Sequence, residues 1–363
     1  MSVEEAGLDG AVHALLSALE SLTFAQRHLH PGLLTRLGEH IAKYESRLVE
    51  AQQTVRAAAQ SEQATALDTA LELTLRAVRA LPLAGQDPNG VYAAYRALRY
   101  VPYAHEALYA LVNDSPDVDA FFLEPSARTG DVRAVAEPAC GEVLHINNER
   151  GSKGGYSAYI PATADNAEQA VVFALHGGAG HGRGFLWTWM REARTRNIVL
   201  VTPTSCGQTW GLHEPQEDNA NFARILDALE QRAKIDRTRM LLTGMSDGGT
   251  FTFVSGLAAA SPFSHLAPIA ASFHPFMLEM IDTPKVAGRS IYLTHGVHDW
   301  MFQIDVARTA RQVLTGLGAQ LVYREIQDLA HTYPREENAL ICDWFLHGIM
   351  PTSEQGRDEA LHD

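Results

Sequence analysis

The stretch MLLTGMSDGGTFTFVSGL, residues 240–257, joins a short apolar run, a glycine-rich turn and a second run with helical spacing. Its centre, Gly244-Met245-Ser246-Asp247-Gly248, matches the pattern G-x-S-x-G, and Gly249 follows it. Between a strand and a helix, this pattern places the serine hydroxyl at the tip of a sharp turn. Glycines around the serine keep side chains out of the crowded backbone. We therefore expect Ser246 to be a nucleophile.

Short apolar or β-rich runs occur on both sides of this turn, and helical segments separate most of the later ones. Such alternation predicts an α/β fold with a mostly parallel sheet and helices on both faces. Several runs are continuously apolar, as expected for strands that are covered on both faces. The eight candidate strands are 142–146, 156–160, 170–175, 198–202, 240–243, 267–271, 290–294 and 320–325.

A second glycine-rich loop, His176-Gly177-Gly178-Ala179-Gly180, follows one of these apolar strands. An acyl-transfer enzyme needs backbone N–H groups directed at the oxyanion that develops on its substrate. Gly178 and Ala179 are candidates to supply such donors, and the amide of Asp247, directly after the nucleophile, is another. We expect His176 to brace the loop through hydrogen bonds.

Asp299 lies just beyond the strand run 290–293, in the sequence H-G-V-H-D-W. Active sites of open α/β sheets form at the carboxyl ends of the strands, and a carboxylate there can hold a histidine in its tautomer. The alternative for Asp299 is to cap a helix that begins near Gln303. Asp305 and Asp328 are weaker candidates, because the first falls inside that helix and the second lies three residues before the candidate base.

That candidate base is His331, which follows the last strand and precedes a helical run at 336–345. A general base needs a loop position of this kind. The chain contains 16 histidines, so the assignment depends on the order Ser…Asp…His, which α/β hydrolases share. His295 and His298 precede the last strand, and we expect both to serve loop structure.

Residues 140–350 resemble the α/β-hydrolase superfamily, most of all its compact esterase branch of carboxylesterases, dienelactone-hydrolase-like enzymes and polyhydroxybutyrate-depolymerase-like esterases. The shared features are H-G-G, G-M-S-D-G-G, H-G-x-x-D-W and A-H-T-Y-P before a final amphipathic helix. The resemblance implies an eight-stranded α/β-hydrolase sheet and a carboxylic-ester hydrolase with the triad Ser246, His331 and Asp299. One fold hosts many chemistries, so the substrate does not follow from it.

The leading interpretation is a hydrolase of small esters that works through an acyl-enzyme. A peptidase or a thioesterase with the same triad is an alternative, and so is a binding protein that keeps the fold without catalysis. Trp210 and Trp300 fall in loops at the carboxyl ends of strands. We expect them to line a pocket for the acyl or alcohol group, with a plain core role as the alternative.

The first part of the chain has a different pattern, in which apolar residues recur at helical spacing with a break at Pro102. We expect an all-helical N-terminal domain over 1–115, a connecting segment over 116–139, the α/β-hydrolase domain over 140–350 and a flexible tail over 351–363. The helical domain is expected to be a cap over the active site or an oligomerisation surface, as in a homodimer. Packing behind the sheet is the alternative.

Composition excludes several classes of function. The formal net charge of −14 argues against binding to nucleic acid or to anionic membranes. No apolar run is long enough for a membrane span, and the N-terminus lacks the features of a signal peptide. Cys140, Cys206 and Cys342 are far apart and predict neither a disulfide framework nor a zinc site. We expect a cytoplasmic protein without metal or cofactor.

Overall fold

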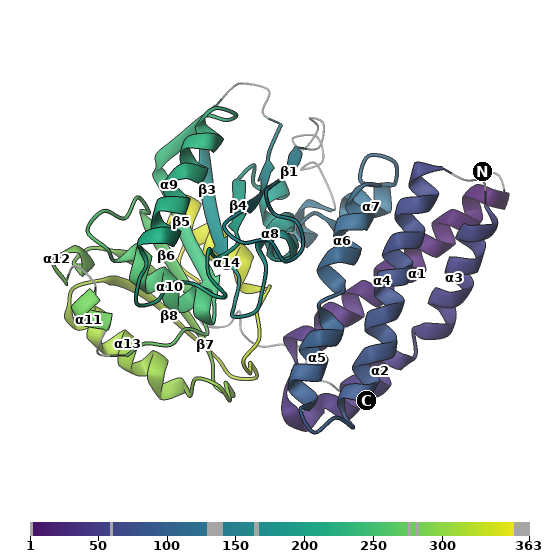
Figure 1. The fold of residues 1–363 in the computed structure, drawn as a ribbon, viewed down its shortest axis with the longest axis horizontal. Helices are drawn as coiled ribbons and strands as arrows, with labels where there is room; N and C mark the ends of the chain where they lie inside the picture. The colour runs from purple at the N-terminus through teal and green to yellow at the C-terminus, as the bar shows by residue number, and fades with distance from the viewer. Residues whose placement is uncertain are drawn as a thin grey trace. The chain divides into compact units, whose positions relative to one another are not determined.

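The computed structural model divides the chain into two units, Met1–Cys140 and Gly141–Asp363, drawn as a ribbon in Figure 1. Each unit is described by itself. Cys140, the later part of the expected connecting segment and nearly all of the expected tail lie outside the described residues. The structure describes residues 3–58, 61–128, 141–162, 167–274, 277–280 and 283–351.

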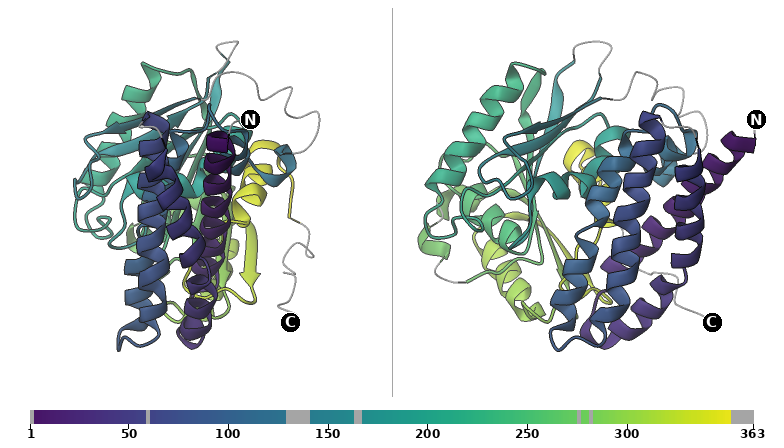
Figure 2. Two further views of the ribbon diagram at one scale, coloured as in Figure 1. Left: turned by 90° about the vertical axis from the view of Figure 1, so that its right-hand side faces the viewer. Right: turned by 45° about the vertical axis from the view of Figure 1, so that its right-hand side comes forward.

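The first unit is a bundle of helices built around α4 (Glu62–Ala84). The apolar stripe of α4, which includes Leu67, Leu71 and Val78, is buried, because helices pack through their apolar faces. The other elements are α1 (Val3–Arg27), η1 (Pro31–Leu33), α2 (Leu34–Ala42), α3 (Glu45–Ala57), α5 (Gly90–Leu98), α6 (Val101–Tyr109), α7 (Pro116–Phe121) and η2 (Pro125–Ala127). Helices α1, α2, α3, α5 and α6 all pack against α4, and Figure 2 shows the bundle from two further sides.

Two of the described α-helices in this unit have a proline at their start. The expected break at Pro102 is present: Pro102 stands at the beginning of α6, where the missing backbone N–H has no partner to lose. Pro116 begins α7, and the side chain of Ser115 caps that helix by accepting a hydrogen bond from Val118 N. Helices α7 and η2 lie in the segment that the sequence suggested would be a connection.

The second unit is built on an eight-stranded sheet with the order β1-β2-β4-β3-β5-β6-β7-β8. Strand β2 pairs antiparallel with β1 and β4, and the remaining neighbours are parallel. All the expected strands are present, although β5 begins earlier and β6 is shifted toward the N-terminus. Their bounds are β1 (Glu142–Ile146), β2 (Tyr156–Ile160), β3 (Gln169–Leu175), β4 (Val199–Pro203), β5 (Ile235–Met245), β6 (His265–Ile269), β7 (Ser290–Gly296) and β8 (Gln320–Ile326).

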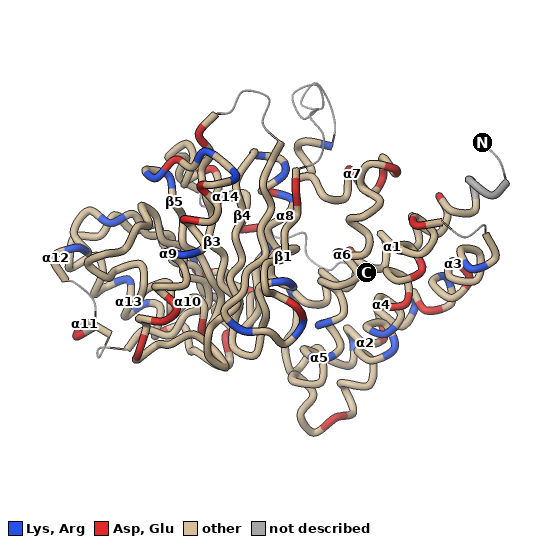
Figure 3. The backbone as a smooth tube through the Cα atoms, turned by 45° about the horizontal axis from the view of Figure 1, so that its top comes forward, with Lys and Arg blue, Asp and Glu red and all other residues tan. Residues whose placement is uncertain are grey.

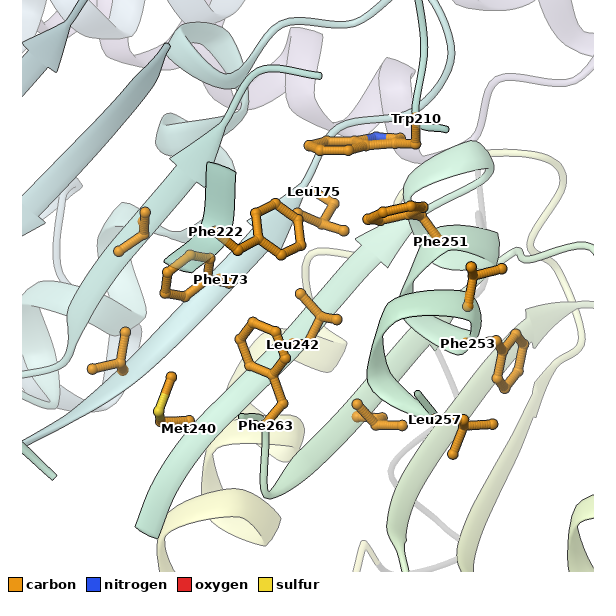
Figure 4. Packing of buried hydrophobic residues seen from close by; sticks show 14 of the residues in the cluster. Phe173, Leu175, Trp210, Phe222, Met240, Leu242, Phe251, Phe253, Leu257 and Phe263 are labelled. Atoms are coloured by element: carbon orange, nitrogen blue, oxygen red, sulfur yellow. The ribbon is translucent and has the colours of Figure 1, made fainter. Parts of the chain in front are cut away.

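Helices connect most of these strands: α8 (Gly182–Thr195), α9 (Gln216–Glu230), α10 (Asp247–Gly256), α11 (Met277–Met280), α12 (Thr283–Val286), α13 (Ile304–Gly316) and α14 (Glu337–His347). Successive side chains of a strand point to opposite faces of the sheet. Phe173 and Leu242 point to the face where α9, α10 and α13 contribute to one apolar core, shown in Figure 4. Each fully buried phenylalanine stabilises such a core by about 1.5–3 kcal/mol.

The opposite face of the sheet is covered by α14 and α8. Tyr292 of β7 points there, with its ring 5.5 Å from that of Trp344 in α14, and its hydroxyl donates to Glu337 Oε2 at 2.8 Å. Helix α14 packs in turn against α8. The central strands are therefore buried on both faces, which explains their continuous apolar sequences.

Charged side chains of both signs and free cysteines occur at several places along the chain. In the view of Figure 3, Lys and Arg lie among Asp and Glu along both units. Cys206 and Cys342 are free thiols. Within the described ranges, no helix has both the length and the hydropathy needed to cross a membrane.

Candidate active site

Ser246 stands on the turn between β5 and α10 with φ 55° and ψ −118°, a left-handed conformation that costs an L-residue free energy. The glycines around it make room for backbone. A Cβ on Gly244 would lie 2.5 Å from the carbonyl oxygen of Gly248, and one on Gly248 would lie 2.5 Å from the carbonyl oxygen of His176. Neither contact is tolerable, so the turn requires glycine at both positions.

The place of this turn in the sheet decides the fold. Ser246 follows a central parallel strand in a sheet whose second strand is antiparallel and whose third and fourth strands exchange places. A sharp strand-to-helix turn at that strand is the nucleophile elbow. The second unit has the α/β-hydrolase fold. The predicted fold class is confirmed.

Three side chains of the α/β-hydrolase unit meet at the carboxyl ends of its strands. His331 Nε2 lies 3.0 Å from Ser246 Oγ, and His331 Nδ1 lies 2.8 Å from Asp299 Oδ2. The carboxylate only accepts, so Nδ1 donates to it and Nε2 is left to accept from the serine hydroxyl. Ser246, His331 and Asp299 are 8%, 3% and 4% exposed, and such burial strengthens hydrogen bonds between them.

The second oxygen of Asp299 holds the loop that carries it. Asp299 Oδ1 accepts hydrogen bonds from Met301 N at 2.9 Å and from Phe302 N at 2.8 Å. Gln303, and not Asp299, is the N-cap residue of α13. Asp299 therefore orients His331 with one oxygen and fixes its own loop with the other, and it does not cap that helix.

The two other candidate acids are exposed. Asp305 lies in the first turn of α13, where its carboxylate is 3.3 Å from Arg308 Nη1, and its side chain is 81% exposed. Asp328 is also exposed. Of the three candidates, Asp299 is the one that the structure brings to His331.

His295, which the sequence suggested was loop structure, supports the acid. It is fully buried, and its Nε2 lies 2.7 Å from Phe302 O and 3.5 Å from Asp299 Oδ2. Burial lowers the pKa of His295, so the neutral ring donates through Nε2 to the carbonyl. The ring of Phe302 meets that of His331 edge-on at 5.3 Å. His295 thus fixes a residue that contacts both Asp299 and His331, whereas His298 is exposed.

The loop after β3 lies across the nucleophile turn. A Cβ on Gly177 would be 3.5 Å from Ser246 Cβ, and one on Gly178 would be 2.7 Å from Asp247 Oδ2. Gly177 therefore faces Ser246, and Gly178 faces Asp247. The loop adds no side chain at these two positions, so its backbone can approach a group bound at Ser246.

The loop is closed by a hydrogen bond from Gly180 N to Gly177 O at 3.0 Å, and Ala179 within it has φ 55°. A turn with positive φ at its third residue is normally occupied by glycine, so Ala179 is strained. In the part of the chain that the structure describes, the backbone amides of Gly178, Ala179 and Asp247 donate to no other protein group.

His176 braces this loop, as expected. Its Nδ1 donates to Gly177 O at 2.7 Å, and its Nε2 accepts from Ser205 N at 3.2 Å. Its own carbonyl oxygen accepts from Trp210 Nε1 at 2.8 Å. Burial lowers the pKa of His176 to about 4. The ring is therefore neutral near pH 7 and uses both nitrogens to hold the backbone.

The structure corrects one of the two expected pocket residues. Trp210 is 2% exposed and stacks on Phe251 with the ring centroids 5.4 Å apart, as Figure 4 shows. Together with its bond to the loop, this burial makes Trp210 part of the core beneath His176 and leaves little surface for a ligand. Trp300 is half-buried, with its ring 6.0 Å from that of His331, and it stays a candidate to contact substrate.

Thr209 is a site residue that sequence analysis missed. Its hydroxyl donates to Asp247 Oδ2 at 2.7 Å and so ties the loop after β4 to the start of α10. No sequence pattern marks Thr209, because the contact depends on how two distant loops fold together.

Solved structures that are similar to this chain include esterases and a peptidase. No family model matches the chain, and no curated protein does. A thermostable esterase is 17% identical, with a TM-score of 0.40 over 51% of this chain and 54% of its own. The acylaminoacyl peptidase of Pyrococcus horikoshii is 16% identical, with a TM-score of 0.47 over 64% of this chain and 45% of its own.

A third solved structure, the S-formylglutathione hydrolase FrmB of Staphylococcus aureus, is 12% identical, with a TM-score of 0.42 over 58% of this chain and 99% of its own. The present chain spans about half the length of the first two structures. Identities this low transfer no substrate from those proteins to this chain.

Proposed function

We propose that this chain is a serine hydrolase that cleaves carboxylic esters through an acyl-enzyme. One observation carries the proposal: Ser246, at the tip of a strained turn, is joined by hydrogen bonds to His331 and through it to Asp299. Nucleophile, base and orienting acid then have the mutual geometry that acyl transfer needs.

In the proposed acylation step, Ser246 Oγ attacks the carbonyl carbon while its proton passes to His331 Nε2. The new Oγ–C bond forms a tetrahedral intermediate. Its collapse breaks the bond to the alkoxy oxygen, which leaves with the proton from His331 as an alcohol. Asp299 stabilises the imidazolium between these two transfers.

Water then hydrolyses the acyl-enzyme, and His331 again serves as base and then as acid. It gives a proton to His331 Nε2 as its oxygen attacks the acyl carbon, and His331 returns the proton to Ser246 Oγ when the acid leaves. Amides of Gly178, Ala179 and Asp247 are the proposed donors to the oxyanion in both steps. Their lack of protein acceptors within the described residues supports this role.

Thioester or peptide hydrolysis by the same triad is the alternative within catalysis, and a binding protein that keeps the fold is the alternative outside it. The geometry favours catalysis, because the backbone strain at Ser246 has a cost that binding alone does not require.

The test is labelling of Ser246 by a fluorophosphonate probe, followed by turnover of matched ester, thioester and anilide substrates with one acyl group. Ser246→Ala should keep the fold, lose the label and lose about a millionfold in turnover. Activity retained by this variant would refute the mechanism. Labelling with faster turnover of the thioester or anilide would refute only the ester assignment.

A further inference from the structure

Asp247 brings a negative charge beside the proposed oxyanion hole. Its backbone amide is one of the proposed donors. Its carboxylate oxygen Oδ2 lies 2.7 Å from the place where a Cβ on Gly178, a second proposed donor, would be. The side chain is half-buried, so the carboxylate lies at the active site and is partly open to solvent.

Asp247 lies in the first turn of α10. Among the described residues it forms no ion pair with Lys, Arg or His. Its hydrogen-bond donor is the neutral hydroxyl of Thr209, at 2.7 Å from Oδ2. A neutral asparagine oxygen would accept the same hydrogen bond, so holding the loop after β4 does not explain why the residue is charged.

The charge also has a cost in the proposed reaction. Negative charge develops on the substrate oxygen in the transition state, and like charges repel more strongly where they are partly shielded from water. A carboxylate next to the donors therefore weakens the stabilisation of the oxyanion of a neutral ester. A positive group on the substrate would instead be attracted to the carboxylate of Asp247. This attraction is stronger when the two charged groups are partly desolvated.

The order of the strands indicates which end of the substrate this group belongs to. Strands β3 and β4 lie on one side of β5, and β7 and β8 lie on the other. Gly178 and Thr209 follow β3 and β4, whereas His331 follows β8. The leaving alcohol must be within reach of His331, which leaves the acyl group on the side away from β8, where it can approach the carboxylate of Asp247.

We propose that Asp247 is a specificity-determining residue that binds the ammonium group of an aminoacyl ester, whose acyl part carries an amine close to the scissile carbonyl. The proposal rests on the proposed function and adds a substrate class to it. The ammonium donates to the carboxylate of Asp247, and the carbonyl oxygen occupies the site of the three amides.

The experiment compares two benzyl esters of nearly equal shape at neutral pH: L-alanine benzyl ester, and benzyl isobutyrate, in which a methyl group replaces the ammonium. The full-length protein should prefer the alanine ester in kcat/KM by about tenfold or more. Asp247→Asn keeps the acceptor for Thr209 and removes the charge. It should lower kcat/KM for the alanine ester by about tenfold and raise it severalfold for isobutyrate.

Thr209→Val is the matched control, because it removes the hydrogen bond and keeps the charge. It should change kcat/KM for both esters in the same direction. An equal loss on both esters in Asp247→Asn would overturn the proposal and leave the carboxylate a positioning role only.

A third pair, acetylcholine and 3,3-dimethylbutyl acetate, carries or lacks the cation on the alcohol. A preference for acetylcholine that Asp247→Asn abolishes would overturn the assignment to the acyl side. Failure of fluorophosphonate to label Ser246 would overturn the proposed function itself. Normal labelling without any preference for cationic esters would overturn only the substrate class.

Discussion

The two sides of Ser246 are built in different ways. On the β7–β8 side, titratable side chains make the contacts: Asp299 and His331 bond to each other, and His295 fixes the loop between them. On the β3–β4 side, backbone makes the contacts, and neutral groups such as the His176 ring hold it in place. One side depends on particular side chains, and the other depends largely on their absence. Substitutions on the two sides should therefore lower turnover or stability for different physical reasons.

The largest effect is expected for the acid of the β7–β8 side. Asp299→Asn should leave a folded protein whose kcat falls by about ten-thousandfold, because an amide at Oδ2 forces His331 into the wrong tautomer. Asp328→Asn is the matched control and should stay within about twofold of the parent, since Asp328 is exposed. Steady-state kinetics with a single ester decide the comparison. The reverse ranking would show that the triad is wrongly assigned.

The difference between the sides also explains what the sequence could predict. The structure brings together Ser246, Asp299 and His331. Their proximity could be predicted because the proposed chemistry fixes the residue types and the topology fixes their order along the chain. The sheet was predictable for a similar reason, since strands buried on both faces leave continuous apolar runs. The exact start of β5 could not be predicted, because residues 236–239 are polar and partly or fully exposed.

Contacts between loops could not be predicted in this way. The hydrogen bond from Thr209 to Asp247 joins residues far apart in the sequence. Trp210 is an aromatic residue in a loop at the carboxyl end of a strand, which predicted a pocket residue. It is buried instead, and its indole N–H donates to the carbonyl oxygen of His176. The role of the helical unit as a cap or an oligomerisation surface stays a prediction, since it depends on how the units are placed.

The next effect tests whether the β3–β4 side depends on missing side chains. Gly178→Ala puts a Cβ 2.7 Å from Asp247 Oδ2, so the loop or the carboxylate must move. We expect kcat to fall by about 100-fold, the lower end of the loss that accompanies removal of one oxyanion donor, with the fold intact. Gly178→Ala combined with Asp247→Ala removes the clash and should recover part of the loss. Strictly additive effects on log kcat in this double-mutant cycle would show that the two side chains do not compete for space.

A smaller effect is expected at His295, which touches no reacting atom and acts as a positioning residue. His295→Phe fills the space but cannot donate to Phe302 O. It should lower kcat by about tenfold, because a misplaced Asp299 stabilises the imidazolium less. The acid limb of the kcat/KM–pH profile should move to lower pH for the same reason. His295→Gln can restore the donor and should recover most of the activity and the profile. A purely structural role predicts lower stability with an unchanged profile.

The smallest effect concerns stability on the β3–β4 side and its dependence on pH. Burial lowers the pKa of His176 to about 4, whereas an unfolded histidine titrates near about 6.5. Between these values the unfolded chain binds a proton that the folded chain does not, so stability falls as the pH falls. The contribution of His176 is fully present above about pH 6.5, and about 3 kcal/mol of it is lost by about pH 4.

His176→Gln removes this titration and weakens the brace, so the variant should be less stable than the parent by about 1–2 kcal/mol at pH 7.5. The difference should shrink and then change sign as the pH is lowered to about 4.5, because only the parent gains the His176 proton on unfolding, which lowers its stability by about 2–3 kcal/mol over this range. Other histidines with lowered pKa values, including the half-buried His265 and the buried His295, are present in both proteins, so their contributions cancel. All five tryptophans fall in residues 187–344, so urea unfolding followed by tryptophan fluorescence reports on the α/β-hydrolase unit alone. Parallel stability curves from pH 7.5 to pH 4.5 would mean that His176 does not stay neutral in the folded state. A difference in unfolding free energy that shrinks as the pH falls would show that acid lowers the stability of the β3–β4 side. Substitutions of Asp299 and His331 are instead expected to lower turnover.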